Sequence, residues 1–376
     1  MTRGTFDFKR SPSGSDHDPA LTVVVEDDPD IAALGEEWQA LEARADGSFF
    51  TSWTWIAALL ANGLVHPLVV RVEAAGRLVA IGIFHRRARG FSRSLSLTSV
   101  DDPEYDAPYV EHNGPLVDRD YPEASGIWWQ AIGRLGASVV YLPGIAPEAL
   151  PGLRRLGTVL VERQQPAPRR SLAPVRACGG DVTALMSPNS RRQIRRAIRA
   201  CEQSGPLTLD RATTPDDARL AFARMAELHR AGWRRRGQAG AMSPLFCRFH
   251  RDVLARGVAA GTADLLTVRA GDRLIGHLYN FRYGRTVSAY QSGFAYDTAL
   301  PHEKPGLVCH ALAIRHYAEQ GLEIYDFLAG AARYKTSFAD HARDLVWLRL
   351  AMGHAPLALM IRARARVAAY RDRRDI

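Results

Sequence analysis

The chain has 376 residues, of which 47% are apolar, and it carries a formal net charge of +9. This length is typical of two domains of ordinary size. No stretch approaches the length of a membrane-spanning apolar segment, and the polar first 20 residues lack the apolar core of a secretory signal, so neither a transmembrane helix nor export is predicted. The four cysteines are scattered, without metal-ligand spacing, which disfavours a zinc site and a disulfide framework and favours a reducing cytoplasm.

Taken in chain order, the predicted elements occur twice. We expect the segment 1–20 to be disordered. Two amphipathic helices then precede a hairpin over 68–84, and the same order of elements recurs before a hairpin over 264–280. Aligning the two hairpins matches Arg77 with Arg273. The helices are expected over 31–44, 53–62, 216–234 and 244–256, and the closing strands are VVYLPG at 139–144 and YDFLAG at 325–330. A repeat of this length indicates duplicated domains.

The two halves differ in polarity at matching positions. His277 falls where the first copy has Ile81, and Asp326 falls where it has Val140. A carboxylate in an apolar row of a strand costs free energy unless it is paired or used. We therefore expect one active site, in the second half, with the first half as a structural partner or as a wall of the substrate cleft.

The stretch 290–335 predicts a strand, a loop, a helix and a second strand, the last over 323–328. Pro305 and Gly306 open the helix, because proline suits the first helical position and glycine lets a ligand approach the backbone. With Lys304 just ahead, this helix start offers N–H groups and the positive end of the helix dipole. The pattern predicts a site for a phosphate or a pyrophosphate.

Basic residues gather in two further places. One predicted helix carries an arginine stripe: Arg191, Arg192, Arg195, Arg196 and Arg199. The stripe is a candidate contact for coenzyme A phosphates, a tRNA backbone, or an anionic lipid or glycan, and a merely solvated face is the alternative. The segment 356–376 mixes arginines with apolar residues, which predicts a surface helix lying on anionic lipid or on another subunit of a homodimer.

A set of motifs runs in order through roughly residues 20–350. They are Phe50-Thr51-Ser52-Trp53, the basic helix 190–199, Leu228-His229 with Trp233, Phe281-Arg282-Tyr283-Gly284, Gly293-Phe294-Ala295-Tyr296-Asp297, Pro305-Gly306, Tyr325-Asp326-Phe327 with Gly330, and Tyr334-Lys335. In order and spacing this set resembles the CelD/BcsL-type acetyltransferases, a branch of the GNAT superfamily, and more distantly the Fem aminoacyltransferases.

The resemblance implies an α/β (α+β) fold of two tandem GNAT-like domains, each a mixed, mostly antiparallel sheet flanked by helices. The expected bounds are a disordered tail over 1–20, a degenerate N-terminal domain over 21–170, a catalytic domain over 171–352 and a basic C-terminal helix over 353–376. It also implies an enzyme that moves an acyl group from an acyl-CoA, such as acetyl-CoA, to an amine of a small molecule or sugar. From the cysteine pattern and the polar N-terminus we expect this enzyme to be cytoplasmic and to need no metal.

The loop ahead of the predicted helix departs from the family's pattern. The usual pyrophosphate signature, Arg/Gln-x-x-Gly-x-Gly/Ala, is absent, and the loop reads His302-Glu303-Lys304-Pro305-Gly306. The donor therefore stays open between acyl-CoA and, as in the Fem relatives, aminoacyl-tRNA. A third alternative is a non-catalytic accessory protein of polysaccharide assembly that keeps the fold as a binding module.

Acyl transfer from a thioester requires an amine that loses a proton, a polarised carbonyl and a thiolate that leaves. We expect Asp326 or His277 as general base, and Tyr334 or Lys335 as the group that protonates the thiolate or holds an anionic acceptor. The structural alternatives are a core position for His277, and for Asp326 an ion pair with Lys335 or a cap on the loop after Gly330.

Binding residues are expected in two groups. For the donor they are Tyr290, Gln291, Ser292, Lys304, Pro305, Gly306 and Leu307, with backbone N–H groups near Tyr290–Ser292 polarising the carbonyl and Gln291 binding the pantetheine arm. For the acceptor they are His229, Trp233, Asp102 and Asp106. A core tryptophan and a solvated acidic loop are the structural alternatives for the second group.

Overall fold

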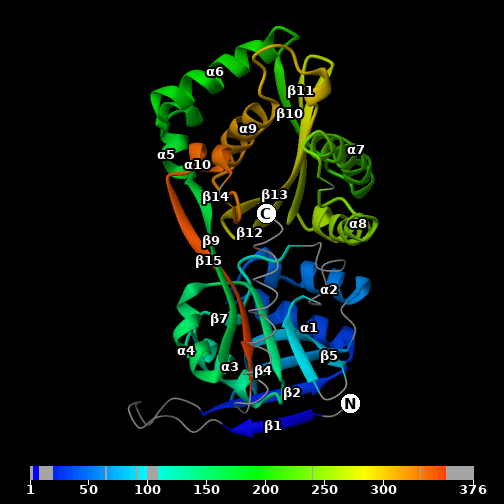
Figure 1. The fold of residues 1–376 in the computed structure, drawn as a ribbon, viewed down its shortest axis with the longest axis vertical. Helices are drawn as coiled ribbons and strands as arrows, with labels where there is room; N and C mark the ends of the chain where they lie inside the picture. The colour runs from blue at the N-terminus through cyan, green and yellow to red at the C-terminus, as the bar shows by residue number, and fades with distance from the viewer. Residues whose placement is uncertain are drawn as a thin grey trace, which may run out of the picture. The chain divides into compact units, whose positions relative to one another are not determined.

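The computed structural model describes residues 3–7, 20–63, 66–89, 92–99, 109–238, 240–330 and 332–352. The chain forms two compact units, unit 1 with residues 1–164 and 345–376 and unit 2 with residues 165–344 (Figure 1). Asp102, Asp106 and the C-terminal helix expected over 353–376 lie outside the described residues. Within the described part of the chain, no helix is long and apolar enough to cross a membrane.

Unit 1 is a mostly antiparallel sheet flanked by helices. Its strand order is β1-β2-β4-β5-β6-β8 and then the portion of β15 from Leu345, and β6 runs parallel to β8. The strands are β1 (Arg3–Asp7), β2 (Leu21–Asp27), β3 (Ala45–Asp46), β4 (Pro67–Ala74), β5 (Arg77–Arg89), β6 (Ser92–Leu97), β7 (Leu116–Asp118), β8 (Val139–Ile145) and β15 (His341–Ala351). The helices are α1 (Ile31–Glu42), α2 (Trp53–Asn62), α3 (Ala124–Ala131) and α4 (Leu150–Leu156).

The first strand corrects the expectation of disorder over 1–20. Residues Arg3–Asp7 pair antiparallel with Thr22–Glu26 of β2. An edge strand is held mainly by backbone hydrogen bonds to its neighbour, so the polar composition around it gives little sign of it. The expectation is therefore wrong for these five residues.

Trp128 of α3 anchors the core of unit 1. Its ring stacks on Phe84 with centroids 5.4 Å apart, and its indole N–H donates to the carbonyl oxygen of Val70 at 2.9 Å. Gly82 allows this approach, because a Cβ at that position would lie 2.3 Å from the Trp128 ring. The helix is thereby fixed against β4 and β5, with its tryptophan fully buried.

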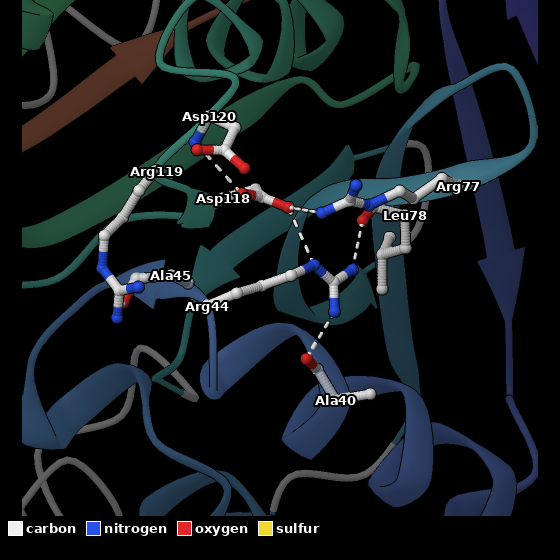
Figure 2. Close-up of polar contacts among 8 residues, drawn as sticks. All are labelled: Ala40, Arg44, Ala45, Arg77, Leu78, Asp118, Arg119 and Asp120. Carbon is white, nitrogen blue, oxygen red and sulfur yellow. Dashed lines mark hydrogen bonds and ion pairs between the residues drawn. The ribbon is translucent and has the colours of Figure 1, made fainter.

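A buried carboxylate ties three elements of unit 1 together (Figure 2). Asp118, at the end of β7, accepts hydrogen bonds at 2.8 Å from both Arg44, just after α1, and Arg77, the first residue of β5. Arg44 also donates to the Leu78 carbonyl oxygen at 2.8 Å. Burial raises the pKa of Asp118, but the hydrogen bonds from the Asp120 N–H and Arg44, with both arginine charges, outweigh it and lower the pKa overall.

Unit 2 is also a mixed sheet with helices on both faces (Figure 1). Its order is β9-β14-β13-β12-β11-β10, with β9 (Thr158–Ser171) belonging to it from Gln165, then β14 (Ile324–Asp326), β13 (Thr286–Phe294), β12 (Arg273–Tyr283), β11 (Ala263–Ala270) and β10 (Leu207–Arg211). One face carries α7 (Pro215–Arg234) and α8 (Pro244–Ala259). The other carries α5 (Leu172–Ala177), α6 (Pro188–Glu202) and α9 (Pro305–Glu319), whose apolar side chains form the core of that face; α10 (Arg333–Phe338) follows β14.

The two predicted hairpins share one register, which confirms the sequence repeat. Arg77 pairs with Ala74 in β4–β5, and Arg273 pairs with Ala270 in β11–β12. In each hairpin the ladder then skips one residue, at Val79 and at the aligned Ile275. The aligned arginines have equivalent partners as well: Arg77 binds the buried Asp118, and Arg273 binds Glu303, whose side chain is also fully buried.

Candidate active site

The parallel pair β13–β14 ends after three residues. Thr286–Ser288 face Ile324–Asp326, whereas β13 continues along β12 as far as Phe294. β14 stops at Asp326 because Leu328 takes a left-handed conformation with φ of 60°, so the strand is shorter than the expected 323–328. Along the rest of β13, β12 is the neighbouring strand in the described ladders, and the opposite edge is left without one.

A bulge in β13 changes which side chains face α9. The ladder with β12 skips Tyr290, and Ala289 and Phe294 therefore pack on the same core although they lie an odd number of residues apart. The Tyr290 ring faces away from α9, with Phe281 at 4.6 Å and His250 at 5.0 Å between ring centroids. The backbone of Tyr290, but not its side chain, therefore remains a candidate for donor binding. Gln291 and Ser292, which follow it directly, are half-buried.

Some of the backbone N–H groups at the start of α9 already donate hydrogen bonds within the helix. The Lys304 carbonyl oxygen accepts from the N–H groups of Leu307 at 2.9 Å and of Val308 at 3.1 Å, and Pro305 has no N–H to offer. Lys304 itself is exposed. Gly306 faces aromatic rings, since a Cβ there would lie 3.0 Å from Phe294 and 3.3 Å from the Tyr296 hydroxyl. The first turn of α9 therefore lies beside Tyr296. It offers fewer free N–H groups to a phosphate than the sequence suggests.

The loop ahead of α9 is held by a buried ion pair. Both carboxylate oxygens of Glu303 accept from the guanidinium of Arg273, and one of them also accepts the Leu300 N–H at 2.7 Å. Arg273 in turn donates to the hydroxyl of Ser204 at 3.2 Å. Because the Glu303 charge is neutralised by this arginine, it opposes an anion at the helix start less than an unpaired carboxylate would.

Asp326 is fully buried and pairs with an arginine that sequence reasoning missed. Its carboxylate lies 2.7 Å from the guanidinium of Arg169, the residue opposite it in β9. Its other oxygen accepts the Leu328 N–H at 2.7 Å and so caps the turn after β14. In unit 1 the equivalent pairing joins Val140 to Leu350. The arrangement suits a residue that holds β14 in place.

Lys335 and Tyr334 lie on α10, directly after that turn. The Lys335 ammonium donates to the carbonyl oxygens of Leu328 at 3.1 Å and of Ala329 at 2.7 Å. Tyr334 is 37% exposed, and burial of its hydroxyl, with Tyr296 nearby, raises its pKa to about 12 although Arg236 lowers it. Tyr334 thus keeps its proton at neutral pH, and the raised pKa makes it a weaker acid than a free tyrosine.

His310 on α9 is the main residue that sequence reasoning missed. Its ring lies against that of Tyr334, with centroids 5.1 Å apart and planes 22° apart, and its Nδ1 lies 3.0 Å from the Tyr325 hydroxyl. Its Nε2 is buried and has no hydrogen-bond partner among the described residues. Burial, and secondarily the Lys335 charge, lower its pKa to about 3. The only signal in the sequence was a histidine among apolar neighbours, between Val308 and Ile314, in a predicted helix.

A buried polar chain continues from His310 through the core. Tyr325 is linked to Asn280, whose amide donates to the Tyr317 hydroxyl at 3.2 Å, and Tyr317 donates to Asp264 at 3.0 Å. All four of these residues are buried. Asp264 also lies 3.2 Å from the guanidinium of Arg211. These hydrogen bonds restrain the orientation of each member in a low-dielectric interior, while the Asn280 Oδ1 has no partner among the described residues.

The C-terminal end of α7 brings the predicted acceptor residues to β13. His229 is buried, and its Nδ1 donates to the Ser292 carbonyl oxygen at 2.9 Å. Its Nε2 therefore carries the lone pair, and it accepts a long hydrogen bond of 3.4 Å from the Ala241 N–H. Trp233 lies 5.8 Å from the His229 ring, and Arg236 stacks over Trp233 at 5.3 Å.

The charge state of His229 follows from its surroundings. Burial lowers its pKa, the hydrogen bond to Ser292 raises it, and the charges of Arg230 and Arg236 lower it, with a net lowering. His229 is therefore neutral at neutral pH, with a free-base nitrogen, as a general base requires.

His277 lies apart from this group. It is buried on the α7 face of β12, its Nδ1 lies 3.0 Å from the Thr267 hydroxyl, and burial with the charges of Arg269 and Arg224 lowers its pKa to about 4. The structure thus brings the start of α9, Gly232 of α7 and Tyr334 close to Tyr296, whereas His277 lies under α7 and Asp326 is bound to Arg169. His229 and Trp233 lie on the same end of α7 as Gly232, and Lys335 follows Tyr334 on α10. Within the described residues, no group of histidine, cysteine and carboxylate side chains could hold a metal ion.

Comparisons with known proteins bear on the fold of the chain and on the family of unit 2. Residues 188–336 match a family model described as an acetyltransferase (GNAT) domain. No protein with a curated description matches the chain. Among solved structures, FemX is similar with a TM-score of 0.60 at 12% identity, covering 90% of this chain and 100% of its own.

Two further structures are similar along most of their length. A C-terminal domain classed as DUF2156 from Agrobacterium fabrum has a TM-score of 0.53 at 13% identity, covering 89% of this chain and 96% of its own. L-PGS from Bacillus licheniformis has a TM-score of 0.52 at 12% identity, covering 88% and 95%. The expected fold of two tandem GNAT-like domains is confirmed, and the chain carries a transferase domain in unit 2; the finer resemblance to the CelD/BcsL type stays a prediction.

Proposed function

We propose that unit 2 is an N-acyltransferase that moves an acyl group, acetyl in the simplest case, from coenzyme A to an amine by direct attack. The observation that carries this proposal is the early end of the β13–β14 ladder, with the start of α9 facing Phe294 at the end of β13 and with Tyr334 on α10, the helix that follows β14. All three lie within the residues that match the acetyltransferase domain. A cytoplasmic location goes with the proposal, because acyl-CoA is an intracellular donor.

The donor is proposed to lie along the open edge of β13. The pantetheine arm would take the place of a neighbouring strand beside Gln291 and Ser292, as an extended chain can on a free strand edge. The diphosphate would lie at the start of α9, where the Gly306 N–H, the helix dipole and the Lys304 ammonium favour negative charge.

His229 is proposed as the general base. The amine nitrogen attacks the thioester carbonyl carbon, and Nε2 of His229, directly or through a water, takes the proton that the amine loses. Trp233 and Arg236 would form the wall of the acceptor site on the same helix. Asp326, predicted earlier as a base, is proposed instead to hold β14 through Arg169.

Tyr334 is proposed as the general acid. When the tetrahedral intermediate collapses, the C–S bond breaks, and the Tyr334 O–H donates a proton to the departing thiolate; solvent then returns the proton from His229 to Tyr334. Lys335 is proposed to fix the loop after β14 through its two carbonyl contacts rather than to react. His310 would hold the Tyr334 ring in orientation.

A steady-state assay of thiol release from acetyl-CoA, run with a panel of amines, tests this function. We expect release that depends on the amine, a loss of about a hundredfold or more in kcat for Tyr334→Phe, and unchanged acetyl-CoA binding by that variant. Tyr109→Phe, which alters an exposed tyrosine of unit 1, is the matched control. Wild-type turnover by Tyr334→Phe would exclude Tyr334 as the general acid.

A second candidate is transfer from aminoacyl-tRNA. The observation in its favour is on α6, where Arg192, Arg196 and Arg199 are exposed at helical spacing and, in the described structure, have no carboxylate partner. Arg191 and Arg195 of the same stripe are occupied, since Arg195 pairs with Asp181 at 2.7 Å and Arg191 donates to carbonyl oxygens. Activity that ribonuclease abolishes, with none from acetyl-CoA, would establish this second candidate.

A further inference from the structure

A pocket of about 450 Å³ lies on the α7 face of the unit 2 sheet, apart from the proposed reaction site. It is lined by Asp217, Leu220, Ala221, Arg224, Thr267, Arg269, Leu274 and His277. Its walls come from the first half of α7 and from the β11–β12 hairpin. The residues proposed for catalysis on α7, His229 and Trp233, belong to the other end of that helix.

His277 is buried, and one of its ring nitrogens, Nε2, has no hydrogen-bond partner in the described structure. Its side chain is 3% exposed, and its Nδ1 is held at 3.0 Å by the Thr267 hydroxyl. The Leu266 backbone also acts on the ring as a hydrogen-bond partner. In the tautomer in which the Thr267 hydroxyl donates to Nδ1, the ring proton lies on Nε2, which has no hydrogen-bond partner among the residues that the structure describes. Since buried polar groups are nearly always paired, the neutral imidazole has room for one acceptor on the pocket side.

Two guanidinium groups face the same space. Arg269 and Arg224 both line the pocket together with His277. Burial, and then the charges of these two arginines, lower the pKa of His277. Arg224 pairs with Glu227 at 2.7 Å, but both side chains are more than half exposed, so water screens that pair. The contact found for Arg269 is a long one, 3.3 Å to the Asp272 carbonyl oxygen. The one carboxylate of the lining, Asp217, is held at 2.7 Å by the Thr214 hydroxyl at the start of α7.

The aligned hairpin of unit 1 shows how a buried cation at this place in the sheet is neutralised. There Arg71 pairs with Ile81, just as Thr267 pairs with His277 in unit 2. Arg71 is buried, and two carboxylates neutralise it, Glu26 at 2.7 Å and Glu37 at 2.9 Å. In the described part of unit 2, no pair of carboxylates neutralises Arg224 and Arg269 beside His277 in this way.

The pocket is separate from the open edge of β13. His277 pairs with Gly293, and α7 lies directly on that glycine, because a Cβ there would come within 2.2 Å of the Met225 carbonyl oxygen. The helix thus seals the sheet between the pocket and the end of α7 that carries His229. A ligand in the pocket would not meet the proposed acyl donor.

We propose that this pocket binds a small oxyanion, a phosphoryl or carboxylate group, between Arg224, Arg269 and the Nε2–H of His277. Two guanidinium groups and one neutral N–H donor suit an oxyanion, since charge-assisted hydrogen bonds from arginine are strong and directional. The site goes beyond the proposed acyl transfer, and its occupant would be a second ligand of unit 2.

NMR of the full-length protein with labelled histidine tests the site, with inorganic phosphate and succinate titrated separately at an ionic strength held constant with sodium chloride. We expect a saturable shift of the His277 ring signals with at least one of the two anions, and the stronger of them identifies the ligand class. Arg269→Gln should weaken binding about tenfold or more, because one charge-assisted contact is lost. Arg256→Gln, at an exposed position on α8, should leave it unchanged.

The proposal fails on any of three results. These are the absence of a saturable shift with either anion, an equal shift with chloride alone, and equal loss of binding in Arg256→Gln and Arg269→Gln. Neither variant removes a buried side chain, so the test does not depend on a folding defect.

Discussion

The Nδ1 of His310 lies 3.0 Å from the hydroxyl oxygen of Tyr325, in a part of unit 2 where both side chains are buried. Tyr325 stands beside Asp326 on β14, and His310 stacks on Tyr334 of α10. This hydrogen bond joins β14, the strand next to the proposed donor site, with α9, and the His310 ring in turn lies against Tyr334, the proposed acid, on α10. We propose that the orientation of Tyr334 depends on this link.

The low pKa of His310 predicts a pH dependence of stability. A histidine with a folded pKa of about 3, against about 6.5 unfolded, binds protons more readily in the unfolded state. Its contribution is complete above the unfolded value and is lost as pH falls below it, by about 1.4 kcal/mol per pH unit. Wild type should therefore lose about 2 kcal/mol more than His310→Gln between about pH 6.5 and 5.

Urea unfolding of unit 2 at several pH values measures this difference. His302→Asn, which changes an exposed histidine in a left-handed position that asparagine tolerates, should follow the wild-type slope. Parallel slopes for wild type and His310→Gln would show that His310 takes up a proton equally in both states, against the prediction.

Asp326→Asn should destabilise the protein strongly. The substitution leaves the Arg169 guanidinium, largely buried, without its carboxylate, which costs about 3 kcal/mol. Asp297→Asn is the matched control: its pair with Arg235 is as short, 2.6 Å, but both side chains are more than half exposed, so we expect a change within about 0.5 kcal/mol. Wild-type stability of Asp326→Asn with lost turnover would return Asp326 to the role of base.

Asp118→Asn should lower the free energy of unfolding of unit 1, again because arginines lose their carboxylate partner. It removes the charge that holds Arg44 and Arg77 (Figure 2), at a cost of roughly 2 kcal/mol because the arginines are partly exposed. Since the folded pKa of Asp118 is lowered, this contribution is present above its unfolded value of about 3.9 and disappears as pH falls through the folded value. Thermal unfolding against Asp46→Asn, which breaks the exposed pair with Arg119, checks it; equal effects would contradict it.

His229→Asn should separate chemistry from binding. The asparagine amide can still donate to the Ser292 carbonyl oxygen but cannot take a proton, so we expect kcat to fall by about a hundredfold or more with little change in the KM for acetyl-CoA. His316→Asn on α9, a half-buried histidine bound to Gln320, serves as control. Equal kcat in both variants would exclude His229 as the base.

The repeat and the main elements could be predicted because they rest on local patterns. Helix α2 matches its expected bounds, 53–62, and the aligned Arg77 and Arg273 take equivalent ladder positions. Periodicity and turn chemistry are properties of neighbouring residues, so a single sequence displays them. The asymmetry between Asp326 and Val140 also marked a real difference between the halves.

The partners of the candidate site could not be predicted, because they come from distant parts of the chain. Arg169 reaches Asp326 only through the β9–β14 ladder, so the ion pair expected with Lys335 involves another residue. His310 lies among apolar neighbours in α9, and its ring contacts Tyr325 and Tyr334. No spacing in the sequence encodes such contacts; they follow from strand order and helix packing.

The central claim is that the start of α9 holds the diphosphate of coenzyme A, and calorimetric titration with acetyl-CoA tests it most directly. We compare wild type with Gly306→Asp, in which a carboxylate opposes the diphosphate, and with Gly126→Asp in the first turn of α3, where a Cβ meets nothing within 4 Å. We predict binding by wild type and by Gly126→Asp, and a loss of about a hundredfold in Gly306→Asp. Absence of binding by folded wild type, or undiminished binding by Gly306→Asp, would contradict the account.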